Sequence, residues 1–215
     1  MGFPFGADED AGFIIAWLEL NNFKGAAILH KLIKDLDQQY NGTIEIKNLN
    51  GKIDFKNKSI LMKGPGLIDY MQSKIDDRRG ISFELNNCFD GILFLPLLYK
   101  ISKKIIYSQL FFSNSQNEIN VYQVSNNKII FKCEDNVNKI PLGQIKITMD
   151  NNKKYLKNFL NKNIISEEII QKNLSTSLTP ENNIWDKISK IANRTYVLES
   201  DKSRNKGAGG GNAND

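Results

Sequence analysis

The amino-acid sequence predicts an α+β fold in which an antiparallel sheet, built around a meander, is joined to an N-terminal helical hairpin and C-terminal helices. Three observations support this: two helix-like segments open the chain, three strand-like runs follow one another in its middle, and helix-like segments close it. Helical and strand-like patterns do not alternate, as they would in a doubly wound parallel sheet. With 215 residues, the chain is long enough to bury a sizeable core.

The helical hairpin is expected to consist of helices over residues 7–20 and 25–39. The apolar stripe of the first helix is formed by Phe13, Ile14, Trp17 and Leu18. Asp8, Glu9 and Asp10 lie in its first turn, where carboxylates complement the free backbone N–H groups of a helix.

Residues 43–63 follow a period of two, which predicts short antiparallel strands. The alternating apolar residues are Ile44 and Ile46, Ile53 and Phe55, and Ile60 and Met62. Gly64-Pro65-Gly66 is then expected to start a short helix. A strand is predicted over 81–85 and a helix over 91–104, in which Pro96 either kinks the helix or marks its true beginning.

The clearest strand-like region predicts a three-stranded meander, because its apolar runs are separated by short turns rich in Ser and Asn. Its strands are expected over 107–112, 118–124 and 128–133. The elements expected after it are a strand over 144–149 and helices around 153–161, 166–173 and 183–193. We therefore predict one domain, residues 1–198, followed by a Gly-rich C-terminal tail, residues 199–215.

Composition favours a cytoplasmic protein that binds neither nucleic acid nor a membrane. The net charge is +5, but the lysines are scattered, whereas nucleic-acid binding needs clustered cations. No apolar run approaches the roughly 18 residues that span a bilayer, and no signal-peptide pattern opens the chain. In a reducing compartment, Cys88 and Cys133 are expected to be buried or half-buried thiols rather than a disulfide.

Few residues carry an obvious chemistry. His30, the only histidine, lies at the margin of an apolar helix face, which favours a partly exposed helix residue over a catalytic base. Histidine and cysteine spacings predict no metal site, and no phosphate-binding loop or other motif identifies a cofactor. The tail has two open interpretations: a solvated terminus, or a segment whose glycine N–H groups and Arg204 wrap an anion.

Two segments near the chain ends have distinctive patterns. The first is Gly2–Gly12, GFPFGADEDAG, which leads into a Trp-Leu helix. The second combines Arg194–Val197 (RTYV), Ser203-Arg204, Gly207–Gly211 (GAGGG) and Asn214-Asp215. Both segments resemble an uncharacterised bacterial family, domain of unknown function 3726. Leu198 and Gly210 depart from the family pattern, which has Pro and Ala there. The family also has a preceding helix, so the resemblance implies that this helix is lost or that the start codon lies further upstream.

The resemblance implies that the tail has a role. Our leading hypothesis is an enzyme or enzyme subunit that binds a small anionic metabolite, with the tail closing the site. The candidate ligand-binding residues are Ser203, Arg204, Gly207, Gly209 and Gly211, and the candidate acids or bases are Glu9 and Asp215. The alternative is a non-catalytic interaction module whose tail docks into a protein partner.

Overall fold

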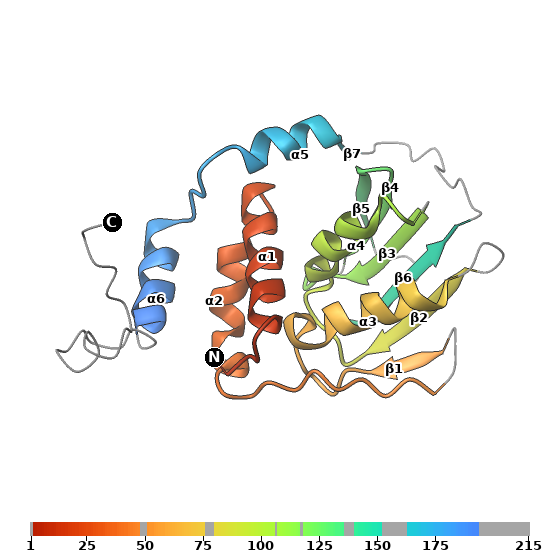
Figure 1. Ribbon diagram of the computed structural model, residues 1–215, viewed down its shortest axis with the longest axis horizontal. Coiled ribbons are helices and arrows are strands. Elements are labelled where there is room, and N and C mark those ends of the chain that lie inside the picture. The colour runs from red at the N-terminus through yellow and green to blue at the C-terminus, as the bar shows by residue number, and fades with distance from the viewer. Residues whose placement is uncertain are drawn as a thin grey trace, which may run out of the picture. The chain divides into compact units, whose positions relative to one another are not determined.

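A mixed, mostly antiparallel sheet organises the chain in the computed structural model (Figure 1). Within the described residues it has seven strands in the order β1-β2-β6-β3-β4-β5-β7. The strands are β1 (Lys52–Asp54), β2 (Ile81–Asn86), β3 (Tyr107–Ser113), β4 (Glu118–Ser125), β5 (Lys128–Asp135), β6 (Ile145–Asp150) and β7 (Asn163–Ile165). Only the β1–β2 pair is parallel among them. The predicted α+β class and the β3–β4–β5 meander are confirmed.

The structure describes residues 2–47, 51–75, 80–105, 107–116, 118–135, 140–151 and 163–193. The chain divides into two compact units, Met1–Pro180 and Glu181–Asp215. The first unit contains the sheet and the helices packed on it. The described part of the second consists mainly of helix α6 (Asn182–Ala192). The predicted helix over 153–161 and the whole tail lie outside the described residues.

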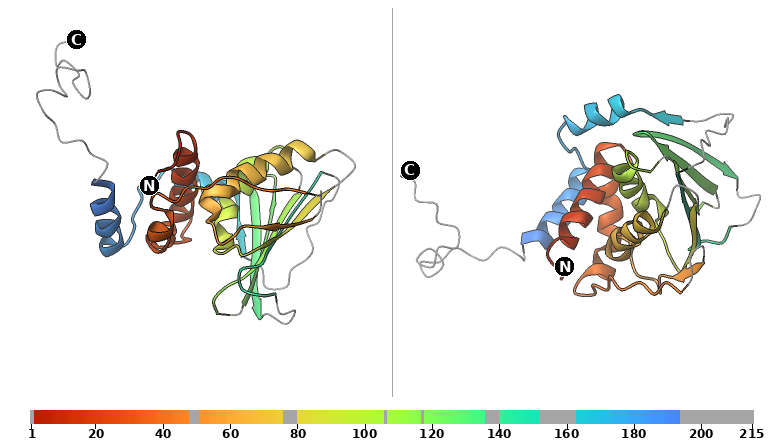
Figure 2. Two further views of the ribbon diagram at one scale, coloured as in Figure 1. Left: turned by 90° about the horizontal axis from the view of Figure 1, so that it is seen from below. Right: turned by 45° about the vertical axis from the view of Figure 1, so that its right-hand side comes forward.

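Helices cover one face of the sheet in the first unit (Figures 1 and 2). Directly on the sheet lie α3 (Ile60–Lys74), the 3-10 turn η1 (Gly91–Phe94) and α4 (Leu95–Ile101). Helix α1 (Ala7–Leu20) packs against α3 and α4, and α2 (Gly25–Leu36) packs against α1. The short helix α5 (Glu167–Leu174) contacts α1. The N-terminal helical hairpin is therefore confirmed.

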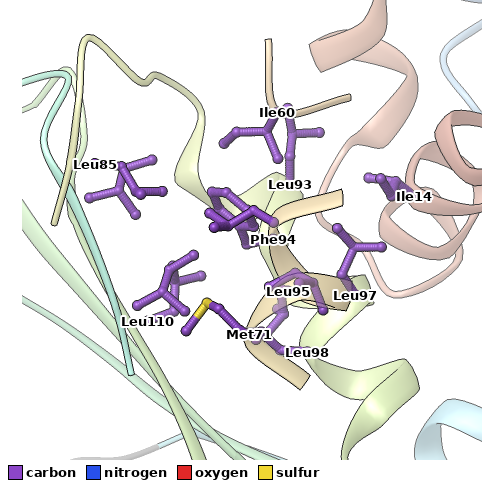
Figure 3. Close-up of a cluster of buried hydrophobic side chains, with 14 of the residues drawn as sticks. Ile14, Ile60, Met71, Leu85, Leu93, Phe94, Leu95, Leu97, Leu98 and Leu110 are labelled. Carbon is purple, nitrogen blue, oxygen red and sulfur yellow. The ribbon is translucent and has the colours of Figure 1, made fainter. Parts of the chain in front are cut away.

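The core fills the space between the sheet and the helices on it. Figure 3 shows Leu85 and Leu110 of the sheet facing Phe94 and Met71 of the helical layer. All four side chains are fully buried, as is Ile14 of α1, which extends the core toward the hairpin. Burying a large apolar side chain of this kind stabilises the fold by roughly 1.5–3 kcal/mol.

Several predictions for residues 43–66 are wrong. Residues 60–62 open helix α3 instead of forming a strand, because Ser59 caps the helix by accepting a hydrogen bond from the Leu61 N–H at 3.1 Å. Gly64-Pro65-Gly66 lies inside that helix, so it does not start it. Of the predicted strands only β1 joins the sheet, and it does so in parallel rather than in a hairpin. Residues 43–47 keep the alternation in burial without forming a strand.

Smaller differences concern helix ends. The second helix stops at Leu36, because Gln38 adopts a left-handed backbone conformation with φ of 57°. The predicted helix over 91–104 consists of η1 followed by α4, which ends at Ile101. Pro96 lies in the first turn of α4, where its missing N–H is not needed. It therefore marks the true beginning of the α-helix.

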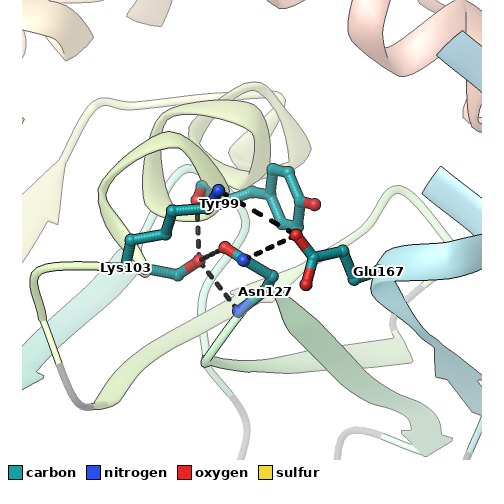
Figure 4. Close-up of polar contacts among 5 residues, drawn as sticks. Tyr99, Lys103, Asn127 and Glu167 are labelled. Carbon is teal, nitrogen blue, oxygen red and sulfur yellow. Dashed lines mark hydrogen bonds and ion pairs between the residues drawn. The ribbon is translucent and has the colours of Figure 1, made fainter. Parts of the chain in front are cut away.

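A partly buried polar junction holds α5 against the meander (Figure 4). The β4–β5 turn places Asn127 at φ 58°, and its side-chain amide donates to Glu167 Oε1 of α5 at 2.9 Å. Its backbone N–H donates to Ser102 Oγ, at the end of α4, at 3.2 Å. Since unpaired buried polar groups are costly, this junction specifies how the three elements meet.

The contact between α1 and α2 depends on the absence of a side chain at Gly25. A Cβ there would collide with the backbone carbonyl oxygen of Ile15 and come within 3.0 Å of the Glu19 N atom. Gly12, also helical, has no atom in the way of a Cβ within 4 Å.

We predict opposite effects of alanine at these two glycines. Gly25→Ala forces the two helices apart and lowers the free energy of unfolding by about 1–3 kcal/mol. Gly12→Ala raises it by about 0.5–1 kcal/mol, because alanine is the better helix former. Urea denaturation of both variants checks this, and a stabilised Gly25→Ala would contradict the close helix crossing.

Candidate functional site

A polar cavity among the described residues lies beside the first turn of α3. Two segments, residues 41–47 and 52–56, turn every second side chain toward it. The lining residues are Asn41, Thr43, Glu45, Lys47, Lys52, Asp54, Lys56 and Lys63, around a volume of about 430 Å³. The intervening apolar residues, such as Ile44 and Ile53, pack on the core instead. We call this the Lys63 cavity.

Lys63 is the buried member of the cavity. The residue is only 4% exposed, because the turn that contains it, Ile60–Gly64, is buried throughout. Helical side chains lean toward the N-terminus of their helix, so Lys63 extends along the first turn of α3. Its Nζ atom lies 5.8 Å from the centre of the buried Phe55 ring. The aliphatic stem is thus enclosed and the amine reaches the cavity.

The carboxylates of the cavity are committed to other partners. Asp54 Oδ1 accepts hydrogen bonds from the Lys56 N–H at 2.7 Å and from Asn87 Nδ2 at 2.8 Å. Glu45 Oε1 accepts from Lys56 Nζ at 3.2 Å. Lys63 has no hydrogen bond or ion pair with any of the residues described. Its contact with Phe55 is at the outer limit of a cation–π interaction, about 6 Å.

The electrostatics of the cavity favour a bound anion. Four lysines and two carboxylates line it, so its net formal charge is +2. The first turn of α3 contains no acidic residue, and the positive end of the helix dipole lies there. Desolvation lowers the pKa of Lys63 from its ordinary value, and the neighbouring Lys56 lowers it further. Asp54 and Glu45 act in the opposite direction but do not compensate.

Asp54 serves mainly to shape the cavity. The hydrogen bond from Asn87, together with that from the Lys56 N–H, lowers the pKa of its carboxyl group, which therefore remains ionised. The same bonds tie the end of β1 to the residue after β2 and hold Lys56 at φ 53°.

The described residues do not show the predicted anion site, which combined Glu9 with residues of the C-terminal tail. Glu9 is exposed in the first turn of α1 and does not line the Lys63 cavity. The other predicted residues, Ser203, Arg204, Gly207, Gly209, Gly211 and Asp215, lie outside the described residues. His30 is half-buried on α2, as expected.

The cysteines differ from each other. Cys88 is buried, and desolvation raises the pKa of its thiol well above the usual range, so it is a poor nucleophile. Cys133 is exposed, which corrects the prediction that both thiols are at least half-buried. Neither cysteine forms a disulfide.

Sequence analysis missed Lys63 although two signals point to it. Polar residues alternate with apolar ones over residues 43–56, a pattern that predicts strands and does not by itself indicate a cavity. A lysine also follows three apolar residues in ILMK, Ile60–Lys63, which becomes informative only once this turn is known to be helical and buried. Both signals depend on recognising Ser59 as a helix cap.

Among the residues that the structure describes, no group of three or more His, Cys, Asp or Glu side chains is placed to hold a metal ion. None of the helices described is both long and apolar enough to cross a bilayer. A second groove, lined by residues that include Asp10 and Lys100, is smaller, about 290 Å³. One of its two lysines is already paired, Lys100 Nζ to Asp10 Oδ1 at 3.4 Å.

We predict that Lys63→Met stabilises the fold at neutral pH by about 1 kcal/mol, because it removes a desolvated charge while keeping the stem. The gain should shrink as the pH rises from the lowered pKa of folded Lys63 toward 10.5, the ordinary value that applies to the unfolded chain. In that window the unfolded chain binds more protons, so wild-type stability rises relative to that of the variant.

Urea denaturation at several pH values measures this difference. Lys128→Met, at an exposed position on β5, is the control and should show no such trend. A Lys63→Met gain that stays constant over this pH range would contradict a desolvated amine.

No protein-family model, no curated protein and no solved structure matches this chain. The resemblance to domain of unknown function 3726 therefore stays a prediction. Inferences about function rest on the Lys63 cavity.

Proposed function

We propose that this protein binds a small, multiply charged anionic metabolite in the Lys63 cavity. The observation that carries the proposal is Lys63, whose side chain is mostly buried and ends at the cavity in an amine with no acceptor or carboxylate partner among the described residues. Buried charges are normally paired, since an unpaired one is costly. An anion would supply the missing partner.

The surrounding residues support an anion with more than one charged group. Lys47, Lys52 and Lys56 line the same cavity and are exposed, so they can meet a second carboxylate or phosphate group. Lys52 and Lys56 contact Glu84 at 3.7 Å and Glu45 at 3.2 Å, but exposed ion pairs of this kind are worth at most about 1 kcal/mol. An incoming anion can therefore compete for both lysines. Asn41 and Thr43 add neutral hydrogen-bonding groups.

We predict that suitable anions raise the melting temperature of the wild-type chain. The probes are inorganic phosphate, citrate and 2-hydroxyglutarate, at constant ionic strength set with sodium chloride. An anion present at 100 times its Kd adds about 2.7 kcal/mol of stability, which corresponds to a shift of roughly 5–10 °C for a domain of this size.

The same experiment includes two matched variants. Lys63→Met should weaken binding roughly 10- to 100-fold, because a charge-assisted hydrogen bond worth about 1.5–3 kcal/mol is lost. Lys128→Met removes the same charge far from the cavity and should bind like wild type. No shift with any probe, or equal loss in both variants, would refute the assignment.

The alternative function, an interaction module that docks through its C-terminal region, is favoured by one observation. Helix α6 carries Ile184, Ile188 and Ile191 at helical spacing, yet none of its residues is buried, and Trp185 is 51% exposed. An apolar face of this kind is typical of a helix that binds a partner.

A chain that ends at Leu198 separates the two roles. All described residues of the Lys63 cavity precede Leu67, so we expect the shortened chain to bind citrate with unchanged affinity. Weaker binding would instead show that the tail, with Ser203, Arg204 and its glycines, contributes to the anion site, as the resemblance implies.

A further inference from the structure

We infer that the Lys63 amine forms an imine with an anionic carbonyl compound, a 2-oxo acid or an aldehyde that carries an anionic group. This inference rests on the proposed function, because the anionic group is what the cavity would bind. It adds a covalent step and a substrate class.

The geometry supports a nucleophilic role. Only an amine that is neutral and unbonded can attack a carbonyl carbon, and among the described residues Lys63 has no carboxylate or hydrogen-bond acceptor that would hold its proton. It is enclosed by Phe55 and by its own helix turn, and a second cation, Lys56, lies at the same cavity. Desolvation and a neighbouring cation are the two conditions that activate catalytic lysines.

The exposed lysines of the cavity do not share these conditions. Lys52 and Lys56 pair with Glu84 and Glu45, and both side chains are largely solvated, at 71% and 63% exposure. They are suited to hold the anionic group while Lys63 meets the carbonyl. The cavity volume, about 430 Å³, falls in the range of small-molecule sites.

The proposed step is balanced without an added reagent. The Nζ lone pair attacks the carbonyl carbon, and the C=O π electrons move to oxygen, which takes up a proton. Loss of water from this carbinolamine, with transfer of the remaining nitrogen proton, leaves a C=N bond to Lys63. The proton that the oxygen takes up is one that the attacking nitrogen gives up, and the water that leaves carries the second one, so the step needs no further acid or base.

The test uses 2-oxoglutarate with sodium cyanoborohydride, which delivers hydride to the imine carbon and fixes the ligand as a secondary amine. The full-length chain is labelled at increasing 2-oxoglutarate, digested and analysed by mass spectrometry. We expect labelling of Lys63 to saturate with 2-oxoglutarate and to be competed by 2-hydroxyglutarate, which has the same charges but no carbonyl. Labelling of Lys128 should rise linearly and resist competition.

Lys63→Arg keeps a cation but removes the amine that forms the imine, so the saturable label at this position should be lost. If wild type binds 2-hydroxyglutarate but Lys63 acquires no saturable label, the imine is overturned and anion binding stands. If neither anion binds, both fail.

Discussion

The complete burial of the first turn of α3 is the constraint on which this site depends. Residues Ile60–Gly64 are all buried. A Cβ on Gly64 would lie 2.7 Å from Ile60 Cγ2 and 3.4 Å from Leu97 and Phe94. A turn packed this tightly leaves a lysine only one route to water. Two flanking segments provide that route, because their alternation puts apolar residues on the core and polar residues around the amine. The same alternation of apolar and polar residues therefore builds this part of the core and lines the cavity.

A desolvated lysine with no charged partner among the described residues, such as Lys63, lowers the free energy of unfolding. Other arrangements of the same fold would avoid this loss of stability. Methionine at position 63 would fill the same space without a charge. An ion pair between Lys63 and either Asp54 or Glu45 would also reduce the unfavourable free energy. Instead, both carboxylates accept hydrogen bonds from other groups. Retaining an unfavourable charge where ligands can reach it is typical of functional sites. This is the physical basis for assigning function to the cavity.

Prediction from sequence succeeded where local patterns agree with tertiary packing. Helix α1 was predicted with its observed ends, and the β3–β4–β5 meander followed from period-two runs separated by polar turns. It failed at residues 60–62, because Ile60 and Met62 fit a strand until Ser59 is recognised as a helix cap. The parallel β1–β2 pair and the Lys63 cavity could not be predicted, since both depend on contacts between segments distant in the chain.

The central claim is that Lys63 is a desolvated, unpaired amine. The most direct measurement is an NMR titration of the side-chain carbon and nitrogen resonances of labelled lysines in the folded protein, with Lys63→Arg used to assign the Lys63 signal. Our account predicts that Lys63 titrates below 10.5, the ordinary lysine pKa, because burial and Lys56 lower its pKa. A Lys63 resonance that titrates at 10.5 or above would contradict the account.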